Sequence, residues 1–116
     1  MLVQVAAARG IDDLFVHHFQ TDQLLVVRGI FVLVVLCDRQ YQYIPLSEYR
    51  PAVVTIPLNV PHSAINLNDK PCVMVNAVLR HGAPYLKDYQ PRRHPFSYDL
   101  DAARKVIANL ELPLTA

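Results

Sequence analysis

The first three quarters of the chain consist of short apolar runs separated by turn-forming residues. Val, Ile, Leu and Phe, which favour strands, are frequent in the runs at 14–19, 23–29, 30–37, 52–58 and 72–79, and HSAINL at 62–67 is a further predicted strand. The segment YQYIPL at 41–46 alternates instead, with Tyr41 and Tyr43 on one side. Between the runs lie TD, CDRQ, YRP, NVP and NDKP, which contain residues common in turns. Short strands that do not alternate with helices predict an antiparallel all-β sandwich or barrel.

The run IFVLVVLC at 30–37 has no polar residue. A strand of this kind is expected to be covered on both faces. One cover is expected to be the opposite sheet, and the other a partner subunit. The sheets also carry more apolar surface than one small sandwich can hide, so the sequence predicts a homodimer.

The tail changes character. Residues 81–96 contain three prolines and predict a loop. Residues 99–111 predict a helix that begins at Asp99 as N-cap, because Leu100, Ala103, Ile107 and Leu110 recur at helical spacing. The predicted organisation is therefore one domain over 1–116, with a barrel over about 1–80 and a helix packed on a sheet.

Composition narrows the class of protein. The chain has 116 residues, 53% of them hydrophobic, and a formal net charge of +1. These values suit one packed core and give no indication of a nucleic-acid or membrane partner. Cys37 and Cys72 lie inside apolar runs and predict free thiols in a reducing compartment. The first ten residues lack a basic region before their apolar part. The sequence thus predicts a cytoplasmic protein.

His62 is the first candidate for chemistry. It follows PLNVP, so two prolines stiffen the loop before it. In a strand, His62, Ala64 and Asn66 share a face. If that face points into a barrel, Asn66 can hydrogen-bond below the histidine. The alternative is a histidine at a turn on the edge of a sheet.

The stretch VHHFQTDQ supplies the second candidates. His17 and His18 are adjacent, so in a strand they face opposite sides. Val16, His18 and Gln20 form the more polar of the two faces. His18 and Gln20 are therefore predicted to face a polar cavity, and Gln23 opens the next strand.

These residues resemble those of cupins. Pro57, Asn59, His62 and Asn66 are similar to the cupin motif Pro-x-Gly-x-x-His-x-x-x-Asn, with Asn59 in the glycine position. Asn tolerates positive φ better than most residues. The stretches HFQ and QLLVVRG, ending at Gly29, resemble dTDP-4-dehydrorhamnose 3,5-epimerases and dTDP-4-keto-6-deoxyglucose 3,4-ketoisomerases, over about residues 14–91. The resemblance implies a cupin-type double-stranded β-helix, or jelly roll, with a C-terminal helix.

The same resemblance implies metal-free proton transfer next to the keto group of a dTDP-linked deoxy sugar, without a cofactor. It assigns catalysis to His18 as base and His62 as second polar group. It assigns substrate binding to Gln20, Gln23, Asn66 and Tyr43. Val75 occupies the position of the epimerases' catalytic tyrosine, so the proton donor is left open among Tyr41, Tyr43, Tyr85 and Tyr89.

A second hypothesis remains beside the isomerase. A divalent metal ion would be held by His18, His62 and Asp22, with His17 as a further candidate. In a third, the chain is a ligand-binding cupin without catalysis, since an apolar barrel mouth with a few polar groups suffices for that.

Overall fold

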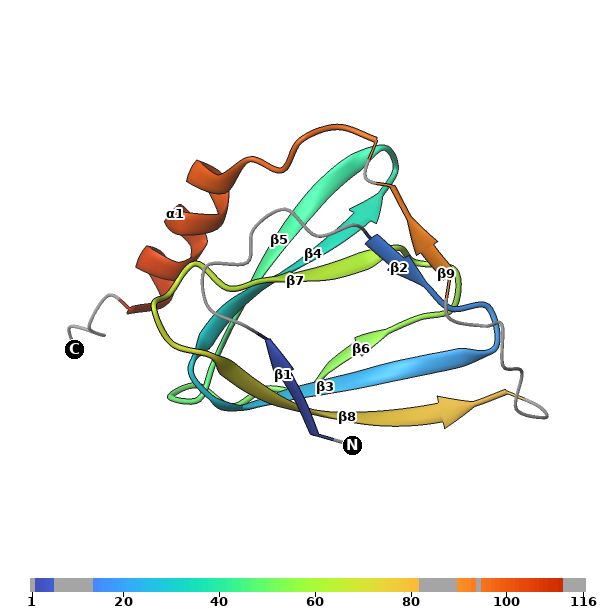
Figure 1. Cartoon of the computed structure of the whole chain (residues 1–116), viewed down its shortest axis with the longest axis horizontal. Helices are drawn as coiled ribbons and strands as arrows, with labels where there is room; N and C mark the ends of the chain where they lie inside the picture. Colours follow the sequence, from blue (N-terminus) through green and yellow to red (C-terminus); the bar gives the residue numbers. More distant parts are fainter. Residues whose placement is uncertain (1, 6–13, 82–89, 94, 112–116) are drawn as a thin grey trace.

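Two antiparallel sheets and one helix make up the described chain (Figure 1). The computed structural model describes residues 2–5, 14–81, 90–93 and 95–111, and only the backbone for 2–5, 90–92 and 110–111. In chain order the elements are β1 (Leu2–Val5), β2 (Leu14–Val16), β3 (Gln20–Arg28), β4 (Ile30–Cys37), β5 (Gln40–Ser47), β6 (Val54–Ile56), β7 (His62–Ile65), β8 (Cys72–Arg80), β9 (Gln90–Arg92) and α1 (Leu100–Glu111). The prediction of an all-β jelly roll with a C-terminal helix is confirmed.

The strands form sheets in the orders β1-β8-β3-β6 and β5-β4-β7-β2-β9. β1 and β9 were not predicted from the sequence. β1 pairs with β8, and β9 pairs with β2. β9 lies within residues 81–96, which were expected to form a loop. Both are short strands whose position depends on a distant partner strand.

The main core lies between the two sheets. Leu24 and Val26 of β3 face Phe31, Leu33 and Val35 of β4 across it, and each is at most 8% exposed. Alternation along β3 therefore puts its even-numbered residues inside and its odd-numbered residues outside. This parity decides which polar residues can reach the interior.

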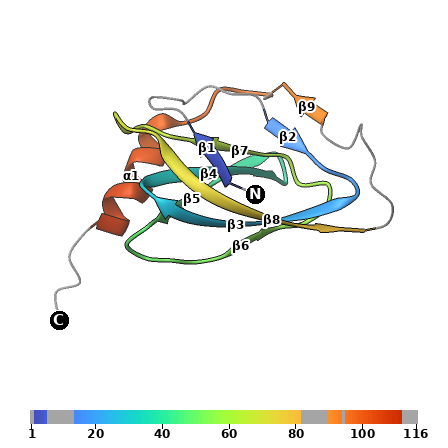
Figure 2. The same ribbon diagram turned by 60° about the horizontal axis from the view of Figure 1, so that its bottom comes forward.

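The second face of β4 is covered by the protein's own helix. Val32 and Val34 point away from the main core and pack in a second cluster with Ala103 and Ile107 of α1. Figure 2 shows α1 on the side of β4 and β5, away from β3 and β8. The prediction that a partner subunit covers this face is wrong, because the helix already fills it.

The helix begins where the sequence predicted. The backbone N–H of Ala102 donates to Asp99 Oδ1 at 3.0 Å, which is the N-cap interaction. The N–H of Asp99 donates to the Tyr43 hydroxyl at 2.7 Å, so β5 anchors the start of the helix. With 12 residues, α1 falls short of a membrane span, and the described part of the chain contains no helix that could form one.

Candidate functional site

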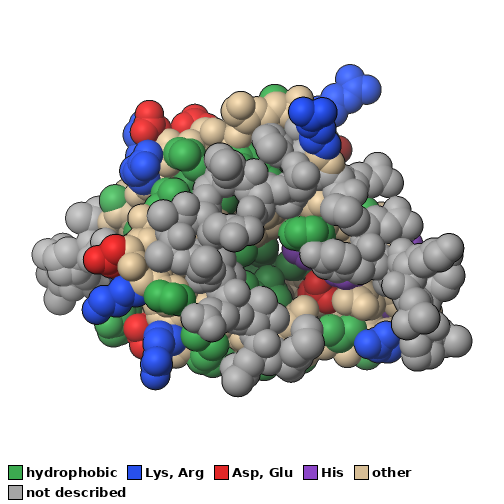
Figure 3. Space-filling view, viewed as in Figure 1, with side chains coloured by type: hydrophobic (Ala, Val, Ile, Leu, Met, Phe, Trp, Pro, Cys, Tyr) green, Lys and Arg blue, Asp and Glu red, His purple; other side chains and the backbone are tan. Residues whose placement is uncertain are grey.

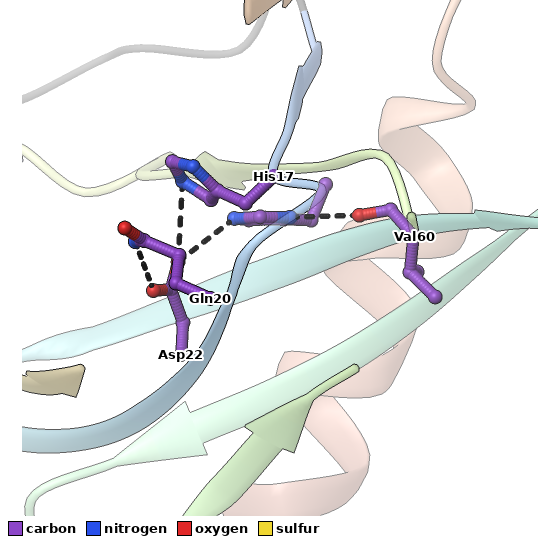
Figure 4. Close-up of polar contacts among 5 residues, drawn as sticks. His17, Gln20, Asp22 and Val60 are labelled. Carbon is purple, nitrogen blue, oxygen red and sulfur yellow. Dashed lines mark hydrogen bonds and ion pairs between the residues drawn. The ribbon is translucent and has the colours of Figure 1, made fainter. Parts of the chain in front are cut away.

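A buried carboxylate at the start of β3 is the centre of the site. Asp22 is 4% exposed, and its Oδ2 lies 3.5 Å from His17 Nε2 and 3.5 Å from His62 Nε2. Gln20 Nε2 donates to the other carboxylate oxygen, Oδ1, at 2.9 Å. Figure 4 shows both imidazole rings directed at Asp22. We call His17, Asp22 and His62 the triad.

β3 and its neighbours place Asp22 inside the molecule. Asp22 has the same parity as the core residues Leu24 and Val26, so it faces the space between the sheets. It pairs in register with Ile56 of β6 and Val78 of β8. The carboxylate therefore sits at one end of an apolar interior. In the space-filling view, hydrophobic side chains line a hollow, with acidic and histidine side chains beside it (Figure 3).

His62 is the first residue of β7, and its ring is held from both ends. Nδ1 lies 3.0 Å from the Val60 carbonyl oxygen, and a carbonyl can only accept, so Nδ1 carries a hydrogen. Nε2 faces Asp22: in the protonated ring it donates a hydrogen bond to the carboxylate, and in the neutral ring it carries the lone pair. His62 is thus prepared to take up a proton or a cation at Nε2. The structure places His62, which the sequence analysis singled out, in the interior at 9% exposure.

His17, and not His18, joins Asp22 and His62. β2 ends at Val16 and β3 begins at Gln20, so residues 17–19 form a bend where strand alternation does not apply. The Nδ1 atom of His18 hydrogen-bonds to the side-chain oxygen of Asn59 instead. The prediction that His18 shares the cavity face with Gln20 is wrong for this reason. Gln20, by contrast, reaches Asp22 through its side-chain amide.

Asn59 holds this bend in place. Its backbone N–H donates to the His17 carbonyl oxygen at 2.7 Å, and its side chain contacts His18. Its φ is 64°, in the left-handed region, where Asn is tolerated better than most residues. This angle is one that glycine adopts readily, which is compatible with Asn59 in the glycine position of the motif. The loop before β7 therefore positions both His62 and His17.

The electrostatics keep Asp22 ionised. Burial by itself raises the pKa of this carboxyl, but hydrogen bonds from His62 and Gln20 and the charges of His17 and His62 outweigh it. The pKa of Asp22 therefore lies below its ordinary value of 3.8. At neutral pH a fixed negative charge faces the two histidine nitrogens.

Two predicted binding residues lie on other faces. Gln23 has odd parity on β3 and pairs with Ala77 and Thr55 on the outer face of the sheet. Tyr43 pairs with Val34, which belongs to the helix side of β4, and its hydroxyl accepts the Asp99 N–H. Neither side chain is directed toward the triad.

The remaining predicted residues divide in the same way. Asn66 is fully buried, but its amide donates to the Lys70 carbonyl oxygen and its Oδ1 accepts the Asn68 N–H, so it stabilises the turn before β8. Val75 faces outward, opposite in parity to the buried Met74. Tyr41 donates to the Phe96 carbonyl oxygen at 2.6 Å, beside the helix. Tyr85 and Tyr89 lie outside the described residues.

Sequence reasoning missed Arg80. This residue pairs with Gln20 across β3 and β8, so the two side chains project from the same face of the sheet as Asp22. Arg80 is exposed. The available signal was that Arg80 and Met74 are an even number of residues apart on β8 and so share a face of the sheet. This places Arg80 near Gln20 and Asp22 only once the register between β8 and β3 is known.

The triad is a candidate site for a divalent metal ion. One ligand atom of each residue lies within 4.8 Å of the others, and each histidine nitrogen lies 3.5 Å from Asp22 Oδ2. Ligands bound at about 2.0–2.2 Å to a tetrahedral or octahedral ion lie roughly 3.0–3.6 Å apart. The bond from His62 Nδ1 to Val60 is also the outer contact that orients a metal-binding histidine. Two histidines and one carboxylate are a donor set for zinc, iron or manganese.

In sequence comparisons, no family model and no curated protein matches the chain. Solved structures do resemble it. CapF, a capsular polysaccharide assembling protein from Staphylococcus aureus, superposes with a TM-score of 0.65 and 22% identity, over 77% of this chain and 26% of its own. A sugar phosphate isomerase from a cupin superfamily, from Silicibacter pomeroyi, gives 0.55 and 17%, over 83% of this chain and 67% of its own.

The chain has the cupin fold. A variant of Bacillus subtilis oxalate decarboxylase also superposes, with a TM-score of 0.55 and 19% identity over 79% of this chain and 22% of its own. The chain spans about a quarter of the length of CapF. At these identities the likeness establishes the fold, and the chemistry has to be argued from the site.

Proposed function

We propose that this cupin is a sugar isomerase or epimerase that moves a proton next to the keto group of a dTDP-linked deoxy sugar, with the triad as its reaction centre. The observation that carries the proposal is the position of two imidazole nitrogens at 3.5 Å from one buried, ionised carboxylate oxygen. The sequence resemblance to dTDP-keto-sugar epimerases and ketoisomerases supports the substrate class. CapF and the Silicibacter isomerase are proteins of the same fold whose names place them in sugar chemistry.

The proton transfer follows from the tautomer of His62. A keto group acidifies the C–H beside it, and the lone pair on His62 Nε2 accepts that proton. The C–H bond breaks, an N–H bond forms, and the electron pair moves to the carbonyl oxygen as an enolate. Asp22 stabilises the imidazolium, because its negative charge lies 3.5 Å from the same nitrogen. Return of a proton to the other face, or to a neighbouring carbon, completes epimerisation or isomerisation.

His17 is the second acid–base group of the proposal. The role that the sequence assigned to His18 passes to His17, because His17 Nε2 reaches Asp22 while His18 is held by Asn59. A ring centroid distance of 5.9 Å separates His17 from His62. The two bases therefore share one carboxylate oxygen and lie close enough together to act on neighbouring positions of one sugar.

Arg80 supplies a positive charge for the phosphates of the substrate. It projects from the same sheet face as Asp22 and Gln20 and is exposed at the end of β8. A guanidinium binds phosphate oxygens in a bidentate manner. An anionic sugar derivative therefore suits the site beside Arg80 better than a neutral free sugar.

Deuterium exchange tests the proposal directly. The protein is incubated with dTDP-4-keto-6-deoxyglucose in D₂O, and incorporation at the carbons next to the keto group is followed by NMR. We expect incorporation with the wild-type chain and with His18→Gln, and its loss with His62→Gln and His17→Gln. Loss of incorporation in His18→Gln alone would restore His18 as the base. Incorporation no faster with the wild-type chain than without protein would refute the proposal.

A metal-binding cupin is the second candidate, and the spacing of the triad is the observation that favours it. A divalent ion held by His17, Asp22 and His62 would polarise a bound carbonyl or hydroxyl oxygen. Metal content is measured in protein purified without an affinity tag and reconstituted with Zn²⁺, Mn²⁺ or Fe²⁺. One equivalent that Asp22→Asn abolishes supports the metal centre. Exchange that survives complete chelation supports metal-free proton transfer.

A further inference from the structure

Apolar surface lies open directly beside the triad, and the proposed proton transfer gives it no role. Val54, Val60 and Ala64, here called the apolar wall, pack against the main core between the sheets, yet each is only partly buried. A side chain that faces the interior and keeps solvent-accessible area borders a space that a small molecule can enter. In Figure 3, hydrophobic side chains line a hollow, with histidine and acidic side chains beside it. Apolar surface next to a few polar groups is the usual lining of a ligand site.

Each member of the apolar wall lies close to a member of the triad. Ala64 follows His62 by two residues on β7, so both side chains project from the same face of the strand, with Cα atoms about 6.6 Å apart. The carbonyl oxygen of Val60 accepts the hydrogen of His62 Nδ1 at 3.0 Å. Val54 belongs to β6, the strand that pairs with β3 around Asp22. A group bonded to the carbon that gives its proton to His62 therefore meets this wall.

We infer that the apolar wall binds the methyl group of the deoxy sugar and so selects a 6-deoxy sugar over one that keeps its C6 hydroxyl, an inference that rests on the proposed function. In a 4-keto-6-deoxy sugar, carbon C5 lies next to the keto group and carries both an acidic hydrogen and the methyl group. When His62 Nε2 takes that hydrogen, the methyl group lies one bond from the reacting carbon. Burying it against Ala and Val is favourable, whereas a hydroxyl there would lose its hydrogen bonds to water.

Ala64 is the residue that leaves room for the methyl group. Alanine is depleted in strands, where β-branched residues are favoured, and Ala64 pairs with Leu33, a much larger residue of β4. A larger side chain at this position would fill the space beside the imidazole of His62. The side chains of the apolar wall carry no polar atom, so they offer a C6 hydroxyl no hydrogen bond. An apolar pocket of this kind rejects an added hydroxyl by about 10–100-fold.

Isothermal titration calorimetry with dTDP-6-deoxyglucose and dTDP-glucose tests the inference. The two nucleotides differ only in the C6 hydroxyl, and neither has a keto group, so binding is measured without turnover. We expect the wild-type chain to bind dTDP-6-deoxyglucose about 10–100-fold more tightly. Ala64→Val fills the space and should lower the affinity for dTDP-6-deoxyglucose to that for dTDP-glucose. Ala64→Ser supplies a hydroxyl and should reduce the preference by raising the affinity for dTDP-glucose.

Ala77→Val is the matched control, because Ala77 is exposed on β8 and pairs with Gln23 on the outer face of the sheet. It should keep the wild-type preference. Equal wild-type affinity for the two nucleotides, or an unchanged preference in the Ala64 variants, would overturn the inference and leave the proton transfer standing. If neither nucleotide binds, the inference and the proposed dTDP-sugar substrate fail together. If Ala64→Val does not fold, Ala64→Ser decides, since it adds a single heavy atom.

Discussion

Replacing Asp22 with Asn tests the central physical claim, which is that the fixed negative charge of Asp22 stabilises the imidazolium formed during proton transfer. The substitution keeps the shape of the side chain and an oxygen that can accept the hydrogen bond from Gln20. It removes the charge that lies 3.5 Å from both Nε2 atoms. The fold should therefore survive, while the chemistry should not.

The distance sets the size of the expected effect. Two unit charges about 3.5 Å apart attract by roughly 5 kcal/mol at an effective dielectric constant of ~20. Part of this attraction is already used in the resting site, and water at the mouth screens some of the rest. If about 4 kcal/mol of imidazolium stabilisation is lost in the transition state, turnover falls by about a thousandfold, since each 1.36 kcal/mol is tenfold.

The assay is the rate of deuterium incorporation into dTDP-4-keto-6-deoxyglucose at saturating substrate. Asp101→Asn is the matched control, because the side chain of Asp101 is 88% exposed and contacts Arg104 on the helix surface. We expect the control to match the wild-type rate and Asp22→Asn to lose at least about two orders of magnitude. An Asp22→Asn variant that folds and retains a rate within a few-fold of wild type would refute the electrostatic reasoning.

Four further outcomes follow from the structure. The pKa of Asp22 is lower in the folded chain than its unfolded value of 3.8. Ionisation of Asp22 therefore stabilises the fold above pH 3.8, and this contribution is lost as the pH falls through the folded pKa. The stability difference between wild type and Asp22→Asn, measured by urea unfolding, should shrink below pH 3.8. Asn59 has a φ of 64°, so its substitution by Ala should cost about 1–2 kcal/mol of unfolding free energy through backbone strain. Substitution by Gly should preserve the backbone and lose only the contact to His18. A Gly variant as unstable as the Ala variant would contradict the strain at this φ. Asp99→Ala should lower the free energy of unfolding by about 1 kcal/mol through loss of the N-cap and leave turnover intact, and thermal unfolding checks this. Burial raises the pKa of Cys72 to about 11, so a thiol reagent should titrate only the exposed Cys37 in the native chain and both thiols after denaturation.

The sequence predicted most of the fold because its signals are local. Apolar runs bounded by turn residues located the strands from 14 to 80, and the periodicity after Asp99 located the helix. β1 and β9 escaped notice, since such short edge strands are defined by the strands they pair with. The cover of β4 was misassigned for a related reason: a wholly apolar strand shows that both faces are buried, but not by what.

For the candidate site, the sequence by itself determined the residue types and one anchor. The motif from Pro57 to Asn66 singled out His62, and the stretch VHHFQTDQ singled out Gln20 and, as a possible metal ligand, Asp22; the structure brings these three side chains together. Only the tertiary structure decided that His17 completes the group. Alternation predicts side-chain direction only inside a continuous strand, and residues 17–19 form a bend that a distant loop holds through Asn59. That contact joins residues 41 positions apart, so no local pattern could have shown it.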